Sequence, residues 1–226
     1  MSKKFVTIKI NTQDSNNAES REALTRYGVQ GTPTIVFASS DGGMISQQSG
    51  FISADKFVPV IENALAKEEA FLKKLASVKK TPDDAKLNAE VALTYLERRQ
   101  LAKAERFSEK AFRQDPNNST QLIPKLHNQL GIAYGRLVEQ TMFENTEEGE
   151  MHFAKALSHF KTVIDTYPQS DVYEEAQYYL GGAYAAKGDF KASISVLEKL
   201  LHRATDETIK QNVKAMLERV KDSASK

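Results

Sequence analysis

The spacing of hydrophobic positions changes once along the chain, near residue 69. Before that point, short runs of β-branched and aromatic residues alternate with polar, turn-forming stretches, a pattern typical of short strands and helices. After it, apolar residues recur at helical spacing to the end of the chain. The pattern predicts strands at 4–10, 34–37 and 44–51, helices at 22–27 and 53–65, and only helices from residue 69 onward.

The helical part contains three similar units. In each unit, an apolar residue and a small one are followed by a tyrosine, and a second helix repeats a bulky residue and then a small one. Because small residues let two antiparallel helices approach closely, this spacing predicts tandem helix-turn-helix units. The first helices carry Val91, Ala92 and Tyr95; Leu130, Gly131 and Tyr134; and Leu180, Gly181 and Tyr184, and the second helices carry Leu101 and Ala104; Phe153 and Ala156; and Phe190 and Ser193.

These units resemble the tetratricopeptide (TPR) repeat, a helix-turn-helix unit of about 34 residues. We expect a linker helix at 69–83, three TPR-like repeats at 84–205 and a capping helix at 206–226. An acidic insertion at 138–150 lengthens the middle repeat. The resemblance implies a helical solenoid, and such arrays bind peptides or helices of other proteins in a concave groove.

Residues 1–68 resemble the later part of the thioredoxin fold. The segment YGVQGTPTIVF is similar to the family's loop before a strand, and DGGMISQQSGF followed by a helix is similar to its closing hairpin and last helix. The resemblance implies a cis peptide bond before Pro33, with the backbone of Thr32 available to an extended substrate. The family's CxxC motif, with its strand and helix, is missing from these 226 residues. The expected fold class is an α+β, partial thioredoxin-like lobe followed by an all-α TPR-type solenoid.

Composition restricts the chemistry. Cysteine is absent from the chain, which excludes disulfides, thiolate nucleophiles and CxxC redox chemistry, so we expect a redox-inactive protein that is not an enzyme. The 31 Lys and Arg residues balance 30 Asp and Glu, so nucleic acid is not an expected partner. No apolar stretch approaches the roughly 20 residues of a membrane span, and no signal-peptide core is present. The chain as given is expected to be cytoplasmic, with a fragment of an exported protein as the open alternative.

The histidines and paired carboxylates give no sign of a metal or cofactor site. His152 and His159 lie seven residues apart on one predicted helix, so about 10 Å separates them, too far for one ion. We expect them on a solvated face, and we expect His127 to stand alone. The pair Glu147 and Glu148 is expected in a solvated loop of the acidic insertion. No catalytic residue, metal or cofactor is predicted.

The predicted function is therefore binding of another protein or peptide, or service as a structural spacer. The alternative is a fragment of a thioredoxin-family thiol-disulfide oxidoreductase or chaperone whose CxxC half is missing. Because a partial sheet leaves unpaired edges that promote association, a homodimer through the open sheet edge is a further expectation. By resemblance to TPR arrays, the groove is lined by Lys86, Leu93, Leu96, Asn128, Ile132, Arg136, Tyr178 and Ala185.

Overall fold

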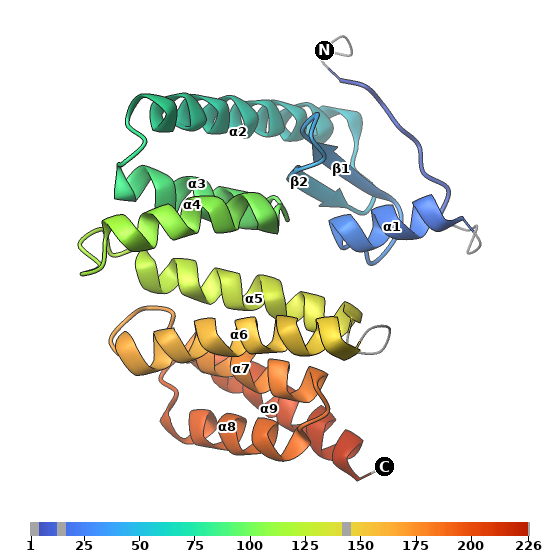
Figure 1. Cartoon of the computed structure of the whole chain (residues 1–226). Coiled ribbons are helices and arrows are strands. Elements are labelled where there is room, and N and C mark those ends of the chain that lie inside the picture. Colours follow the sequence, from blue (N-terminus) through green and yellow to red (C-terminus); the bar gives the residue numbers. More distant parts are fainter. Residues whose placement is uncertain (1–4, 13–16, 142–145, 226) are drawn as a thin grey trace. The chain divides into compact units, whose positions relative to one another are not determined.

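The computed structural model describes residues 5–12, 17–141 and 146–225 (Figure 1). A short helix and a two-stranded sheet come first, and helices follow to the end of the described chain. The elements are α1 (Ala18–Tyr27), β1 (Thr34–Ala38), β2 (Met44–Ser49), α2 (Ala54–Lys80), α3 (Ala85–Glu97), α4 (Leu101–Gln114), α5 (Ile123–Thr141), α6 (Thr146–Thr166), α7 (Tyr173–Ala186), α8 (Phe190–Arg203) and α9 (Glu207–Ala224).

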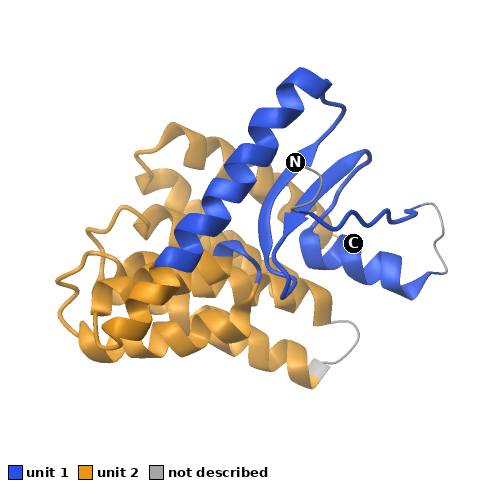
Figure 2. Cartoon of the chain, turned by 90° about the horizontal axis from the view of Figure 1, so that it is seen from above, with its two compact units in different colours: residues 1–73, 97–99 blue, residues 74–96, 100–226 orange. Residues whose placement is uncertain are grey.

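The chain divides into two compact units (Figure 2). Unit 1 comprises residues 1–73 and 97–99, and unit 2 comprises residues 74–96 and 100–226. The helix α2 crosses from one unit to the other without a break at residue 69, where a separate linker helix was predicted to begin. The stretch ALAKEEAFLKK around that point contains no glycine or proline and consists mostly of strong helix formers, so nothing in it ends the helix.

In unit 1, α1 has well-defined caps at both ends. The side chain of Asn17 accepts a hydrogen bond of 3.0 Å from the backbone N–H of Ser20, which satisfies one free donor of the first turn. Gly28 ends the helix in the left-handed conformation, with φ of 61°. The helix therefore begins at Ala18, four residues before the predicted start, because the Asn17 cap allows an earlier first turn.

The strands β1 and β2 form an antiparallel hairpin, in which Thr34 lies opposite Ser49. The turn between them is held by the Ser39 hydroxyl, which donates to the Asp41 carboxylate and accepts from the backbone N–H of Gly43. On one face of the hairpin, Phe37 is buried and its ring lies 6.2 Å from that of Phe57 on α2. The hairpin was predicted from sequence, and the structure confirms it.

The strand predicted at 4–10 is wrong for the described part of that segment. Residues 5–10 form no strand, and Val6 and Ile8 are 90% and 78% exposed. Only Phe5 packs inward, with its ring 5.9 Å from that of Phe37. The β-branched composition favours an extended backbone, but a strand also needs a hydrogen-bonding neighbour, and the described sheet contains only β1 and β2.

Unit 2 is built from helix pairs that pack through small residues. Gly131 on α5 faces Phe160 on α6, and Gly181 on α7 faces Leu197 on α8. In both places an added Cβ would lie 2.6 Å from the facing side chain, so only glycine allows the observed approach of the two helices. The small residues of the second helices, Ala104, Ala156 and Ser193, have no accessible surface, as their repeat positions predict.

The helix α9 closes the last pair. Val213 and Leu217 on α9 join a core cluster with Leu197 and Leu200 on α8. Asp206 caps the start of α9 by accepting hydrogen bonds of 2.7 and 3.0 Å from the backbone N–H groups of Thr208 and Ile209 in the first turn. This helix lies where the sequence predicted a capping helix.

The acidic insertion differs from its predicted form. The helix α5 continues to Thr141, and α6 begins again at Thr146; the intervening part of the insertion lies outside the described residues. Glu147 and Glu148 are exposed as predicted, but they lie in the first turn of α6 and not in a loop. Negative side chains stabilise the N-terminal turn of a helix, which explains why an acidic segment continues the helical pair.

Candidate functional site

The predicted groove residues divide into exposed and buried sets. Lys86 and Arg136 are exposed, and Leu93, Tyr178 and Ala185 are half-buried on α3 and α7. These five side chains are accessible to another molecule. The other three are buried in unit 2, and they are Leu96, Asn128 and Ile132.

Burial of these three corrects the groove prediction at their positions. Asn128 on α5 has no accessible surface, and its Nδ2 donates a 2.7 Å hydrogen bond to Oε2 of Glu175 on α7. Ile132 belongs to the core cluster shared by α5, α6 and α7. A position that faces the groove in a repeat becomes a core position when the next first helix packs on it, and these side chains cannot reach a partner while the helices stay packed.

The surface of α7 beside Asn128 carries three polar or aromatic groups. Glu175 and Tyr178 are separated by one helical turn and share a face, and the rings of Tyr178 and Tyr179 meet edge to face at 5.2 Å. Burial raises the pKa of Glu175, and the hydrogen bond from Asn128 opposes that effect. Burial, with the nearby charge of Glu175 as the next cause, also raises the pKa of Tyr179.

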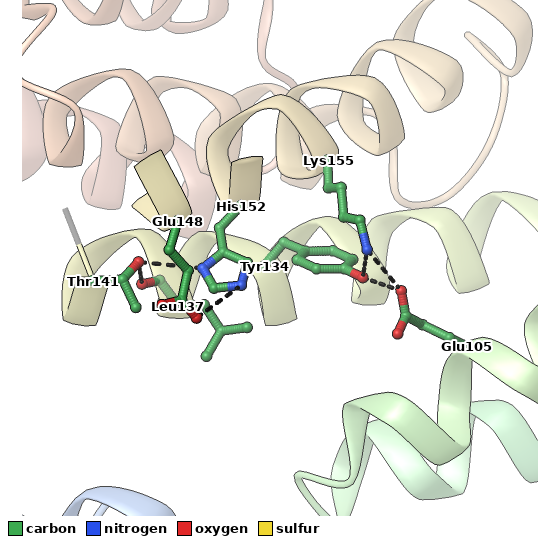
Figure 3. Close-up of polar contacts among 7 residues, drawn as sticks. All are labelled: Glu105, Tyr134, Leu137, Thr141, Glu148, His152 and Lys155. Carbon is green, nitrogen blue, oxygen red and sulfur yellow. Dashed lines mark hydrogen bonds and ion pairs between the residues drawn. The ribbon is translucent and has the colours of Figure 1, made fainter. Parts of the chain in front are cut away.

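A second polar cluster links α4, α5 and α6 (Figure 3). The Tyr134 hydroxyl donates to the carboxylate of Glu105, and Nζ of Lys155 donates to the Tyr134 oxygen at 2.8 Å and to Glu105 at 3.2 Å. The Lys155 ammonium also lies 4.7 Å from the centre of the Tyr134 ring. Burial raises the pKa of the Tyr134 hydroxyl, so it stays protonated and acts as a donor. The three groups satisfy one another and tie three helices together.

Two histidines beside this cluster contact each other, which the sequence analysis did not anticipate. Nδ1 of His127 lies 2.9 Å from Nδ1 of His159, and the His127 ring stacks on Phe112 at 4.2 Å. Neither residue stands alone or on a solvated face, because α5 and α6 bring them together from 32 positions apart. Burial lowers the pKa of each ring from 6.5 to about 4, so both are neutral near pH 7 and one donates to the other.

His152 is also enclosed, contrary to the prediction of a solvated face. It is buried, its Nδ1 lies 3.2 Å from the Thr141 hydroxyl, and its Nε2 lies 4.0 Å from the Glu148 carboxylate (Figure 3). Within the described residues, no group of three or more His, Asp or Glu side chains could hold a metal ion. The histidines thus serve as packing and hydrogen-bonding groups between α5 and α6.

The loop before β1 in unit 1 borders a shallow, open recess of about 390 Å³. The Thr32–Pro33 peptide bond is cis, the geometry implied by the sequence resemblance. The Thr34 hydroxyl donates to the carbonyl of Gly31 at 2.6 Å, and the Gly50 N–H donates to the carbonyl of Pro33 at 2.8 Å. Thr32 and Pro33 are both exposed. The recess is lined by Gly28, Gln30, Gly31, Thr32, Pro33, Gln47, Ser49 and Gly50.

Comparison with protein families supports both parts of the sequence interpretation. A family model for a thioredoxin-like domain matches residues 1–65, and a model for the tetratricopeptide repeat matches residues 175–206, which span α7 and α8. The chain thus combines a thioredoxin-like N-terminal part with a TPR-type helical part. The assignment of α3 to α6 as two further TPR repeats stays a prediction.

No curated protein matches the chain, and no solved structure matches it. Among the helices of the described residues, none is both long enough and apolar enough to cross a membrane.

Proposed function

We propose that this chain is a non-catalytic protein-binding module that holds a peptide or helix of another protein along the first helices of its repeats. The observation that carries the proposal is the half-exposed apolar surface of those helices, formed by Leu93 on α3 and by Tyr178 and Ala185 on α7. Because these side chains stay partly exposed on the first helices of the repeats, they provide an apolar contact area for a partner.

The absence of cysteine supports the non-catalytic part of the proposal. Disulfide exchange requires a thiolate, and this chain contains no thiol, so its thioredoxin-like part cannot carry out that reaction by itself. Thr32 and Pro33 are exposed at the edge of an open recess, which suits binding of an extended segment without chemistry. The alternative, that the chain is part of an oxidoreductase, requires a CxxC motif from outside these 226 residues.

The binding proposal is tested by site-specific photocrosslinking in cells that naturally produce the protein. A benzophenone amino acid is placed in the full chain at position 93 or 178, and at Lys199 as a control, because Lys199 is exposed on the second helix α8. We expect adducts to one identified protein from positions 93 and 178 and none from position 199. Equal adduct yields at all three positions, or none at any, would overturn the proposal.

The non-catalytic part is tested with reduced thiol and insulin. The purified chain is expected to reduce insulin disulfides no faster than the uncatalysed reaction. Turnover that rises in proportion to chain concentration would show that this part of the proposal is wrong.

We further propose that the thioredoxin-like part associates with a second copy. In each copy the β-branched segment at 5–10 forms no strand, Val6 and Ile8 are largely exposed, and the sheet of the described residues consists of β1 and β2 alone. Pairing the segment of one copy with the sheet edge of another would satisfy both. Light scattering should show a concentration-dependent dimer that Ile8→Asp weakens. Weak strand pairing should be visible at about 100 μM. A wild-type chain that stays monomeric at about that concentration would contradict this proposal.

A further inference from the structure

Where α5 contacts α7, the carboxylate of Glu175 forms no ion pair with a lysine or arginine of the described residues. Glu175 is half-buried and accepts a hydrogen bond of 2.7 Å from the fully buried amide of Asn128. Among the described residues, no lysine or arginine nitrogen lies within the 4.0 Å of an ion pair with Glu175. Lys125 acts on it only at longer range, and Asp171 opposes that effect.

Arg136, a second basic residue of α5, is not among the charges that influence the pKa of Glu175. Arg136 is on the same helix as Asn128, eight positions further along, and its charge acts on Tyr179. Tyr178 lies one turn further along α7, and its side chain is partly buried against the core of α8 and α9 and partly exposed. A half-buried carboxylate and a partly exposed aromatic ring therefore lie one turn apart on the helix of the proposed binding surface.

The carboxylate of Glu175 and the ring of Tyr178 together restrict which side chain of a partner can cover them. A partner that docks here removes the remaining water from Glu175, and loss of that water is strongly unfavourable for a carboxylate unless the partner supplies a cationic donor. Partial burial already raises the pKa of Glu175 in the unbound chain. A lysine or arginine side chain meets both requirements, because its charged end pairs with the carboxylate and its methylene stem packs on an aromatic ring.

We infer that Glu175 is the polar anchor of the groove and receives a lysine or arginine side chain of the partner, whose stem lies over the Tyr178 ring. The inference rests on the proposed function, because it names the chemistry that the binding surface selects. It also fixes the position of the partner, since the basic residue must lie opposite the start of α7. Acidic partner segments are disfavoured at the same position by repulsion from Glu175 and Asp171.

The test uses three blocked 12-residue peptides, rich in alanine and leucine, that differ only in a central Arg, Gln or Glu. Their binding to the full chain is followed by fluorescence anisotropy, with NMR amide shifts to locate it. We expect the Arg peptide to bind about tenfold more tightly than the Glu peptide, with shifts in α5 and α7. In Glu175→Gln, which keeps an oxygen for Asn128 but no charge, this preference should fall to within about threefold.

Glu109→Gln is the matched control, because it removes the same charge from an exposed position on α4. It should leave the tenfold preference unchanged, and circular dichroism should show that both variants keep the wild-type fold. The inference is overturned if the Arg and Glu peptides bind with equal affinity, or if the preference survives Glu175→Gln. It is also overturned if none of the three peptides binds at 1 mM, a limit of roughly −4 kcal/mol. Adducts from positions 93 and 178 decide the proposed function separately, since crosslinking there does not depend on the charge of the partner.

Discussion

Gly131 allows two helices to pack more closely than any side chain would permit. A Cβ at this position would lie 2.6 Å from Cε1 of Phe160 and 2.8 Å from its Cδ1. Phe160 is 1% exposed and belongs to the core cluster of α5, α6 and α7, so its ring cannot move into solvent to make room. Gly135, one turn further along the same helix, has no atom within 4 Å of its own added Cβ. The two glycines form a matched pair for substitution by alanine.

The expected effects have opposite sign. Alanine in a helix interior is favoured over glycine by about 0.5–1 kcal/mol, because it has less backbone freedom to lose on folding. Gly135→Ala should raise the free energy of unfolding by about that amount. Gly131→Ala has the same gain but overpacks the α5–α6 contact, which costs about 1–3 kcal/mol. The variant should therefore lie about 1–3 kcal/mol below Gly135→Ala in stability.

Urea unfolding followed by far-ultraviolet circular dichroism measures this difference, provided that both variants give the same slope with denaturant. A second comparison places Gly131→Ala in a Phe160→Leu background, where the smaller side chain should remove part of the cost and make the two changes non-additive. If Gly131→Ala proves as stable as Gly135→Ala, the close approach of α5 and α6 is not what requires glycine at position 131, and the packing argument for the repeat fails.

Two further predictions concern the same helical unit. Ala104 has no accessible surface, so Ala104→Leu should destabilise the chain by about 1–3 kcal/mol. Ala102 is exposed on the same helix, so Ala102→Leu should change the unfolding free energy by no more than about 0.5 kcal/mol. Equal urea midpoints for the two variants would contradict the assigned repeat register. The pKa of His127 and His159 is about 4 in the folded chain against 6.5 for the free side chain. Between these values the unfolded chain binds more protons than the folded chain. Stability should therefore be complete above about pH 6.5 and should fall as the pH drops toward 4. His159→Gln should flatten this dependence, which urea midpoints at pH 7, 5.5 and 4.5, spanning roughly that window, would show or refute.

Local patterns were sufficient for the elements whose structure depends on their own residues. The end of the first helix at Gly28, the hairpin turn and the helical spacing after residue 69 each depend on residues within a few positions of one another. The small residues of the repeat were also readable, because a helix pair that packs closely needs them at fixed spacing, and Gly131 and Gly181 occur there.

Local patterns did not predict the features that depend on contact with a distant segment of the chain. Residues 5–10 have the composition of a strand, but pairing is a property of two segments, and no described strand lies beside them. The contact of His127 with His159 likewise joins positions 32 apart, and no spacing within either helix predicts it.

What the sequence by itself determined about this protein is the set of helices and turns, the close packing within pairs, and the absence of thiol chemistry. Only the tertiary structure decided which side chains of the first helices remain available to a partner. Asn128 and Ile132 occupy groove positions of the repeat, yet both are buried, while Tyr178 stays accessible. The physical reason is that helix formation is governed by local backbone and capping interactions, whereas exposure is set by how closely successive helices pack, which depends on side chains far apart in the chain.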